Sequence, residues 1–377
     1  MTDKTGKPSP RFDVISIFVV TGLTALIVVP WYGIVHGYSP LLWVAFIVVM
    51  MWNGLSITAG YHRLWAHKSY NAHFVVRFIF ALGGALALQN SIKVWCSNHR
   101  SHHRFVDDEA KDPYSARKGF WFSHIGWMLR DYPASLVDEA NVKDLMKDPL
   151  VQFQHKYYWP LSFLMNAGLP LYLGWMAGDA LGGLLLVGFL RLVFCHHTTF
   201  FINSLAHAWG IQPYSDNNTS RDNPVIALLT YGEGYHNFHH TFQWDYRNGL
   251  RWYQFDPTKW LIKSLSWLKL TYGLKRTPPE KIEQSVLNMQ FKNATNQILD
   301  ARKLEAAELL VILEAEYEKL LETLHEWASC RQQWLDIKKA VFVEKWEQTE
   351  LRLKLRELEA SLNLQRHRWQ LMTTQFS

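Results

Sequence analysis

The sequence predicts an all-α integral membrane protein: four transmembrane helices in two hairpins, a histidine-rich helical cap on one membrane face, and a C-terminal helical hairpin or coiled coil. Long apolar runs predict the spans. Histidine clusters lie next to these runs and predict the cap. A charged C-terminal region with a heptad repeat predicts the last element.

Four apolar runs are long enough for a helix to cross about 30 Å of hydrocarbon. They cover residues 14–35, 41–59, 157–177 and 181–205, and the last contains Arg191 and the pair His196 and His197. The first run is too long for the core of a signal peptide, and no small-residue cleavage site follows it. We therefore expect it to be retained as a span.

The distribution of basic residues predicts the orientation. The loops at 33–40 and 174–183 carry one charge, Asp179, whereas the N-terminal segment, residues 63–156 and the chain after Arg221 hold nearly all Lys and Arg. The positive-inside rule places both termini and the large loop in the cytoplasm. The net charge of +6 comes from residues that flank apolar runs, which favours a membrane surface over nucleic acid. The three cysteines have no pairing or metal-ligand spacing.

Residues 74–95 form a fifth apolar stretch that we expect to be an interfacial or re-entrant helix. A span there would place histidines on opposite sides of the membrane. The stretch also contains Arg77, Gln89, Asn90 and Lys93, which are costly inside a bilayer.

After Pro279 the chain contains no Gly and no Pro. Apolar residues recur there at alternating steps of four and three, which predicts two long helices in a hairpin or coiled coil. These residues are Ala306, Leu310, Leu313, Tyr317, Leu320, Leu324 and Trp327, followed by Leu351, Leu355, Leu358 and Leu362. The predicted domains are an N-terminal segment at 1–13, a membrane domain at 14–276 and a helical region at 280–377.

Nine of the 17 histidines form an organised set that predicts a metal centre. In the sequences NHRSHH and YHNFHH, histidines at i, i+3 and i+4 project from one helix face, and neutral imidazole is a good ligand for first-row metals. The nine candidate ligands are His62, His67, His99, His102, His103, His207, His236, His239 and His240.

Helix geometry constrains two members of this set and three polar residues near it. His62 and His67 are five residues apart, about 140° around an ideal helix, so the helix must bend or end between them. Asn203 lies one turn before His207, where its amide is suited to orienting a metal-bound water. His196 is about 16 Å along the helix from His207, so it and His197 are left out of the ligand set.

Nine imidazoles are too many for one zinc ion, so two metal ions are implied. Zinc has no redox chemistry, and no separate acid–base or nucleophilic constellation is visible. A centre beside the hydrocarbon core is best suited to oxygen chemistry at unactivated C–H bonds, which favours iron.

Four sequence blocks then carry a family resemblance: GYHRLWAHKSYNAH, NHRSHHRFVDDEAKDPYSARKGFWFSHIGW, FINSLAHAWGIQPY and GEGYHNFHHTFQWDY. In order and spacing they resemble the membrane fatty acyl desaturases of the stearoyl-CoA (delta-9) type, as a bacterial-like member without fused cytochrome b5. The resemblance spans residues 15–276. It implies two iron ions, O2 as co-substrate, and a kinked channel in which a long saturated acyl chain gains a cis double bond. The nine histidines match the family's metal ligands, and Asn203 matches its asparagine beside the metals.

Two departures from the family pattern leave the acyl carrier open. Ser97-Asn98 stands where animal members carry Arg-Asp, and Arg130-Asp131 stands where they carry a basic pair. These positions lie near the CoA headgroup in the family, so CoA, a glycerolipid and acyl carrier protein all stay open. We expect headgroup or channel-mouth contacts from Asn90, Lys93 and Trp95.

No His-Pro-Gly-Gly haem motif is visible in the sequence. We therefore expect an external electron donor, either a ferredoxin or a cytochrome b5-like protein with its reductase. An acidic donor would suit the basic cytoplasmic face.

Two alternatives remain at this stage. A membrane hydroxylase uses the same ligands and shares the first hydrogen removal, and it would release an alcohol. A non-enzymatic protein that stores or senses metal would bind metal without oxygen-dependent turnover.

Overall fold

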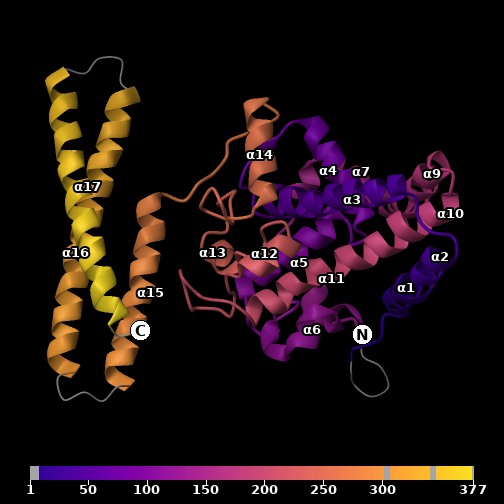
Figure 1. The fold of residues 1–377 in the computed structure, drawn as a ribbon, viewed down its shortest axis with the longest axis horizontal. Coiled ribbons are helices and arrows are strands. Elements are labelled where there is room, and N and C mark those ends of the chain that lie inside the picture. Colours follow the sequence, from indigo (N-terminus) through magenta and orange to yellow (C-terminus); the bar gives the residue numbers. More distant parts are fainter. Residues whose placement is uncertain (1–7, 301–305, 340–344, 376–377) are drawn as a thin grey trace. The chain divides into compact units, whose positions relative to one another are not determined.

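The computed structural model describes residues 8–300, 306–339 and 345–375. Its contacts define two compact units. The first ends at Arg276, and the second begins at Thr277 and also includes Pro213–Asp216. Both units are built mainly from helices, as the sequence predicts, and each is described by itself (Figure 1).

Three helices of the first unit are long and apolar enough to cross a membrane. Each is interrupted by π-helical turns without losing continuity. They are Phe12–Val35 (α1 Phe12–Leu23, η1 Thr24–Val28, α2 Val29–Val35), Pro40–Ala66 (α3 Pro40–Leu55, η2 Ser56–Ala66) and Ala180–His207 (α10 Ala180–Gly183, η8 Leu184–Leu190, α11 Arg191–Asn203, η9 Leu205–His207). Large apolar side chains such as Leu26 and Ile34 stay exposed on them, as expected for lipid-facing surfaces.

The third apolar run of the sequence is also helical. It comprises α8 (Tyr158–Phe163), η7 (Leu164–Gly168) and α9 (Leu169–Met176). This helix is not among the three that meet the length and hydropathy required of a span. The structure therefore supports three of the four predicted spans.

The helix predicted over residues 74–95 is two helices. α4 (Phe74–Leu86) ends, the chain turns, and α5 (Ile92–Phe105) begins with Ser91 as its N-cap, whose hydroxyl accepts from the Val94 N–H. At about 1.5 Å per residue, the 13 residues of α4 extend about 20 Å, less than a membrane thickness. The stretch is thus broken at Leu88 and Asn90, whose positive φ separates α4 from α5, whereas the expectation that the stretch does not span a membrane agrees with the length of α4.

Short elements complete the first unit. They are η3 (Ala116–Lys118), α6 (Phe120–His124), η4 (Gly126–Met128), η5 (Pro133–Ser135), η6 (Leu145–Lys147), α7 (Pro149–Lys156), α12 (Pro224–Leu229), α13 (His236–Thr241) and α14 (Pro257–Trp267). Strands β1 (Asn71–Ala72) and β2 (Thr271–Tyr272) pair antiparallel and tie the end of this unit to the segment after η2.

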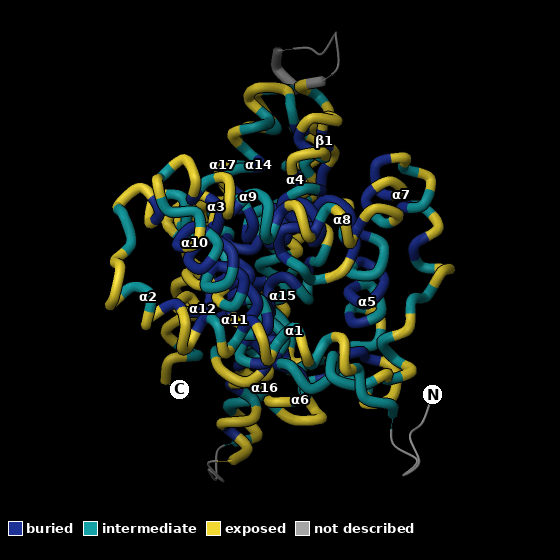
Figure 2. Tube along the Cα trace, turned by 90° about the vertical axis from the view of Figure 1, so that its right-hand side faces the viewer, coloured by how far each residue is buried: buried dark blue, intermediate teal, exposed yellow. Residues whose placement is uncertain are grey.

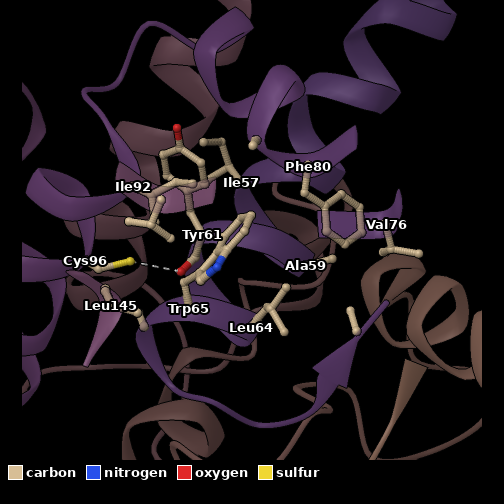
Figure 3. Close-up of a cluster of buried hydrophobic side chains, with 14 of the residues drawn as sticks. Ile57, Ala59, Tyr61, Leu64, Trp65, Val76, Phe80, Ile92, Cys96 and Leu145 are labelled. Atoms are coloured by element: carbon tan, nitrogen blue, oxygen red, sulfur yellow. Dashed lines mark hydrogen bonds between the residues drawn. The ribbon is translucent and has the colours of Figure 1, made fainter. Parts of the chain in front are cut away.

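The main hydrophobic core surrounds η2 (Figure 3). Tyr61 and Trp65 of η2 pack with Phe80 of α4 and Ile92 of α5, and the Cys96 thiol donates to the Tyr61 carbonyl. A Cβ at Gly84 would lie 2.1 Å from the Tyr61 ring, so glycine is what lets α4 approach η2 this closely. Figure 2 shows buried residues along α5 and α11 as well. The core thus fixes η2 and α5, the two elements that carry the first histidines.

The second unit is a bundle of three helices, α15 (Pro279–Asp300), α16 (Ala306–Lys339) and α17 (Lys345–Thr374). The prediction of two helices was wrong because it missed α15. Predicted seam residues Leu313, Leu320 and Leu362 are buried, together with Leu287 and Ile298 of α15. Apolar residues of α15 also recur at steps of four and three, namely Leu287, Phe291, Ala294 and Ile298. This heptad signal was therefore present in the sequence.

Candidate metal centre

Four elements present the nine candidate histidines. η2 carries His62 and ends beside His67, and α5 carries His99, His102 and His103. η9 carries His207, and α13 carries His236, His239 and His240. The bend expected between His62 and His67 takes the form of a π-helix. The His67 N–H donates to the His62 carbonyl five residues earlier, and the two ring centroids lie 4.8 Å apart.

The structure brings all nine side chains together in two groups. In each group one nitrogen per ring lies within 4.8 Å of the others. The five-histidine group consists of His62, His67, His99, His103 and His239. The four-histidine group consists of His102, His207, His236 and His240. The rings of His103 and His240 stack at 4.2 Å, so the two groups are adjacent.

Hydrogen bonds at Nδ1 orient several of these rings. His62 Nδ1 lies 2.9 Å from a Glu233 carboxylate oxygen, and His102 Nδ1 lies 2.9 Å from an Asp112 oxygen. Since a carboxylate only accepts, both Nδ1 atoms carry the proton. The lone pairs of their Nε2 atoms are therefore available at the centre of each group, the arrangement found behind metal-binding histidines.

His207 is oriented in the same way through a longer chain. Its Nδ1 lies 2.9 Å from the Thr219 hydroxyl oxygen, and that hydroxyl donates to Asp107 at 2.7 Å. The hydroxyl oxygen is left to accept from His207, so this ring too presents an unprotonated Nε2.

The electrostatics of the site favour neutral imidazole. Burial first, and the neighbouring histidines second, hold the pKa values of His99, His103 and His239 well below the ordinary value. Burial alone would raise the pKa of Glu233, but His62 and Arg63 outweigh it and lower this pKa to about 2. The site thus combines uncharged ligands with an ionised carboxylate behind them.

The distances between facing nitrogens test whether metal ions fit. His62 Nε2 lies 2.9 Å from His239 Nε2, and His236 Nε2 lies 3.1 Å from His207 Nε2. Lone pairs at this separation repel unless a proton or cation lies between them. Two nitrogens bound at about 2.1 Å and at right angles to one first-row ion would be about 3.0 Å apart. The nine imidazoles therefore fit two metal ions held through nitrogen.

A cavity of about 140 Å³ reaches these histidines. Apolar residues of α1, including Val14, Ile17 and Phe18, line one part, and His99, His102 and His236 line another. Asn203, Asn90 and Trp95 also line it, whereas Lys93 does not and instead forms an ion pair with Glu139 at 2.7 Å. A mainly apolar space thus borders the candidate metal ligands.

Two polar residues of the cavity wall, Gln89 and Thr199, were not predicted to line it from the sequence. The Gln89 side chain donates to the Thr199 hydroxyl at 3.0 Å and accepts from the Trp95 indole at 3.3 Å. Trp95 in turn stacks on His99 at 4.8 Å. No sequence spacing links residues 89 and 199, so only the folded chain reveals this contact.

Sequence reasoning also missed the carboxylates behind the ligands. Glu233 lies three residues before His236, a signal within the same motif, yet its partner is His62. Asp112 follows His102 by ten residues through a turn, which no helical periodicity anticipates. His196 and His197 lie outside both groups, as expected: His196 donates to the Ala87 carbonyl and His197 contacts His124.

Residues 10–272 match the family model described as "Fatty acid desaturase". The chain belongs to the fatty acid desaturase family. All nine histidines and the cavity lie inside the matched residues, whereas α15, α16 and α17 lie beyond them. The metal-binding geometry is therefore a feature of the desaturase region.

Curated desaturases show the same relationship. The chain is 44% identical over 247 residues to a probable acyl-CoA desaturase of Schizosaccharomyces pombe, with 65% of this chain and 51% of the relative covered. It is 43% identical over 266 residues to acyl-CoA desaturase 1 of Saccharomyces cerevisiae, with 70% and 52% covered. It is 37% identical over 282 residues to the sn-1 stearoyl-lipid 9-desaturase of Synechocystis, with 74% and 84% covered. The chain thus spans about half the length of the two yeast desaturases.

Proposed function

We propose that this desaturase-family chain catalyses oxygen-dependent desaturation of a long saturated fatty acyl chain, forming a cis double bond at the delta-9 position. The observation that supports this most strongly is the pair of histidine groups that line part of a mainly apolar cavity. A cavity lined by apolar residues suits an acyl chain, and buried nitrogen ligands suit redox metal ions. The reaction belongs to unsaturated fatty acid biosynthesis.

Two iron ions are the proposed cofactors, with O2 as co-substrate. The five-histidine group would hold one ion and the four-histidine group the other. When bound, the irons supply the oxygen activation that hydrogen removal from an unactivated C–H bond requires.

The chain's own residues prepare the site for this chemistry. Glu233, Asp112 and Thr219 hold the imidazoles in the tautomer that directs Nε2 to the centre. The apolar wall contributed by α1 excludes water, and the Gln89 and Trp95 pair forms a fixed polar point beside His99. Asn203 faces the same cavity, where its amide would orient a water at the metals. No separate acid or base is assigned.

We propose acyl-CoA as the substrate, with a lipid-linked acyl chain as the alternative. The names of the yeast relatives specify acyl-CoA, and that of the cyanobacterial relative specifies a stearoyl-lipid. Arg11, Asn90 and Asn98 line the cavity and offer polar contacts to a headgroup. Trp95 lines the same cavity and stacks on His99, so we assign it a contact with the acyl chain beside the candidate ligands. Lys93 does not line the cavity and pairs with the exposed Glu139, and we keep it as a proposed headgroup contact outside the cavity.

The proposed topology has four spans in two hairpins, with both termini and the metal centre on the cytoplasmic side. The helix over residues 158–176 would supply the remaining span and precede Ala180–His207 after a short loop. An external ferredoxin or cytochrome b5-like protein would dock on the same face and deliver electrons. Residues 280–377 would form a separate helical region.

The function is tested by expressing the chain in a cell whose fatty acids are followed by mass spectrometry. A new cis-monounsaturated product supports desaturation, and a hydroxylated product favours the hydroxylase alternative. Purified protein supplied with iron, reductant, O2 and either stearoyl-CoA or a stearoyl-glycerolipid then identifies the carrier. Absence of any product in both assays would reject the proposal.

A further inference from the structure

The C-terminal end of α4 lies inside the protein, where water cannot satisfy its last carbonyl groups. Gly83, Gly84, Ala85 and Leu86 are all buried, and the chain then turns towards α5. The last turn of a helix leaves its carbonyls without partners in the helix itself. Each buried carbonyl therefore needs a donor from elsewhere.

Side chains from three other helices supply these donors. Asn53 donates to the Gly83 carbonyl at 3.3 Å and Asn166 to the Ala85 carbonyl at 3.3 Å. Arg191 donates to the Leu86 carbonyl at 2.8 Å, and His196 donates to the Ala87 carbonyl at 2.9 Å. We name Asn53, Asn166, Arg191 and His196 the α4 cap.

Arg191 organises this cap. Its side chain is fully buried within the Ala180–His207 helix, and among the described residues it forms no ion pair. Besides Leu86, its guanidinium donates to the side-chain oxygens of Asn53 at 3.0 Å and Asn166 at 2.7 Å. Both amides are thereby turned so that their nitrogens face α4.

The position of the charge has a physical reason. A buried cation in a membrane helix is costly and usually marks a functional position. Here it faces the C-terminal end of α4, which carries the negative end of the helix dipole. The cation and the helix end therefore stabilise each other without a carboxylate.

The cap fixes the turn that follows α4. Leu88 and Asn90 in this turn have φ of 50° and 74°, and such backbone persists where its surroundings hold it. Leu88, Gln89 and Asn90 all line the cavity, and the Asn90 N–H donates to the Tyr158 hydroxyl at 2.9 Å. Gln89 leads through Trp95 to His99 of the five-histidine group. Hydrogen bonds at Leu86 and Gln89, the backbone between them and the ring stack of Trp95 on His99 thus connect buried Arg191 with the candidate metal ligands.

We propose that Arg191 is a positioning residue: with Asn53, Asn166 and His196 it caps α4 and holds the Leu88–Asn90 turn against the histidines, which determines the carbon atoms of the acyl chain at which the double bond forms. This inference rests on the proposed desaturation. It assigns no metal or substrate contact to Arg191 itself. The residue acts through the backbone of the turn.

The test compares Arg191→Met with Tyr32→Phe in the purified full chain. Tyr32→Phe removes a hydrogen bond from α2 to Asp179, the N-cap at the far end of the helix that carries Arg191, outside the cavity lining, and serves as the control. In Arg191→Met we expect wild-type iron content, turnover per iron lowered about 10- to 100-fold, and a larger share of double bonds at other positions. Tyr32→Phe should keep the wild-type ratio of positional isomers.

A second pair of variants tests rescue. His196→Gln keeps an N–H donor for the Ala87 carbonyl, whereas His196→Phe keeps the ring without the donor. We expect the isomer ratio to shift in His196→Phe and to return towards the wild type in His196→Gln. These two variants test the positioning role if Arg191→Met fails to accumulate. Equal isomer ratios in His196→Phe and His196→Gln would then overturn the inference.

Hydrogen exchange at the Leu88 and Asn90 amides reports the turn independently of catalysis. Exchange should become faster in Arg191→Met and His196→Phe and stay unchanged in Tyr32→Phe. If the wild type forms no product while exchange changes as expected, the proposed function fails, and only the part of the inference in which Arg191 caps α4 and holds the turn stands. Unchanged isomer ratios and unchanged exchange in Arg191→Met, or loss of iron from it, would overturn the positioning role.

Discussion

The two histidine groups differ in how they are supported. In the five-histidine group, the Glu233 carboxylate behind His62 also contacts Arg63 at 2.8 Å, inside a buried network that includes Asp256. In the four-histidine group, Asp112 supports His102, and its oxygens also accept from the backbone N–H groups of Asp107 and Tyr114. The carboxylate behind His62 is therefore coupled to the core of the fold, whereas the one behind His102 is held by nearby backbone, and His207 of the same group is held through Thr219 and Asp107. Metal binding and stability should respond differently in the two.

The largest expected effect comes from removing a ligand. His239 Nε2 lies within 3.0 Å of both His62 and His103 in the five-histidine group, and His240 Nε2 lies 3.1 Å from His236 in the other. We expect His239→Ala and His240→Ala each to abolish desaturation and to lose one of two irons per chain. Elemental analysis with a product assay measures this, and membrane insertion should be unchanged.

The exposed His325 of α16 provides the matched control. His325→Ala should keep both irons and full turnover. Retained turnover in either ligand variant would contradict the ligand assignment, and loss of both irons from each variant would show that the two groups do not bind independently.

A smaller effect is expected from the carboxylates. Asp112→Asn and Glu233→Gln should each weaken iron binding about 10- to 100-fold, because the ring they orient loses its charged acceptor. Only Glu233→Gln should also destabilise the protein, because it removes a negative charge facing buried Arg63, and breaking such pairs costs about 3–5 kcal/mol. Thermal unfolding without iron distinguishes the two. Equal loss of stability in both variants would contradict the difference in support.

The sequence predicted the histidines of both groups, but it did not predict the carboxylates that orient them. Clusters such as His99, His102 and His103 are local, so helical spacing alone places them on one face of α5. Glu233 and His62 are 171 positions apart in the sequence, and their contact exists only in the folded chain. The ligand set could therefore be assembled from motifs, whereas the network behind it could not.

The same distinction between local spacing and long-range contacts explains where the predicted fold was wrong. The predicted helix at 74–95 is broken at the Leu88–Asn90 turn, where side chains from three other helices satisfy the last carbonyl groups of α4, and no local pattern reveals such a cap. Helix α15 is different, because its apolar residues recur at heptad spacing and the sequence alone therefore predicts it. Local periodicity accounts for helices and seams, and long-range polar contacts decide where the helices stop.

Asn203 should have a smaller effect than any ligand or carboxylate. It lines the cavity and belongs to neither histidine group, so Asn203→Leu should keep both irons. We expect turnover to fall about 10-fold, since a group that orients a metal-bound water tunes the centre without holding it. Iron content and turnover measured on one preparation test this. Loss of iron from Asn203→Leu would instead identify Asn203 as a metal ligand. The four-histidine group could then have five donors, as the other group does.

The smallest effect on either group is expected from the second unit. Leu320 is buried in the α15, α16 and α17 core, whereas Leu364 is 64% exposed on α17. Leu320→Ala should lower the stability of the bundle by about 2–5 kcal/mol, and Leu364→Ala should have little effect. Neither should change iron content or turnover, because all nine histidines and the cavity lie within residues 10–272. A fall in turnover in Leu320→Ala alone would instead show that activity requires the folded bundle. The bundle would then count as a third support of the histidine groups, beside Glu233 and Asp112.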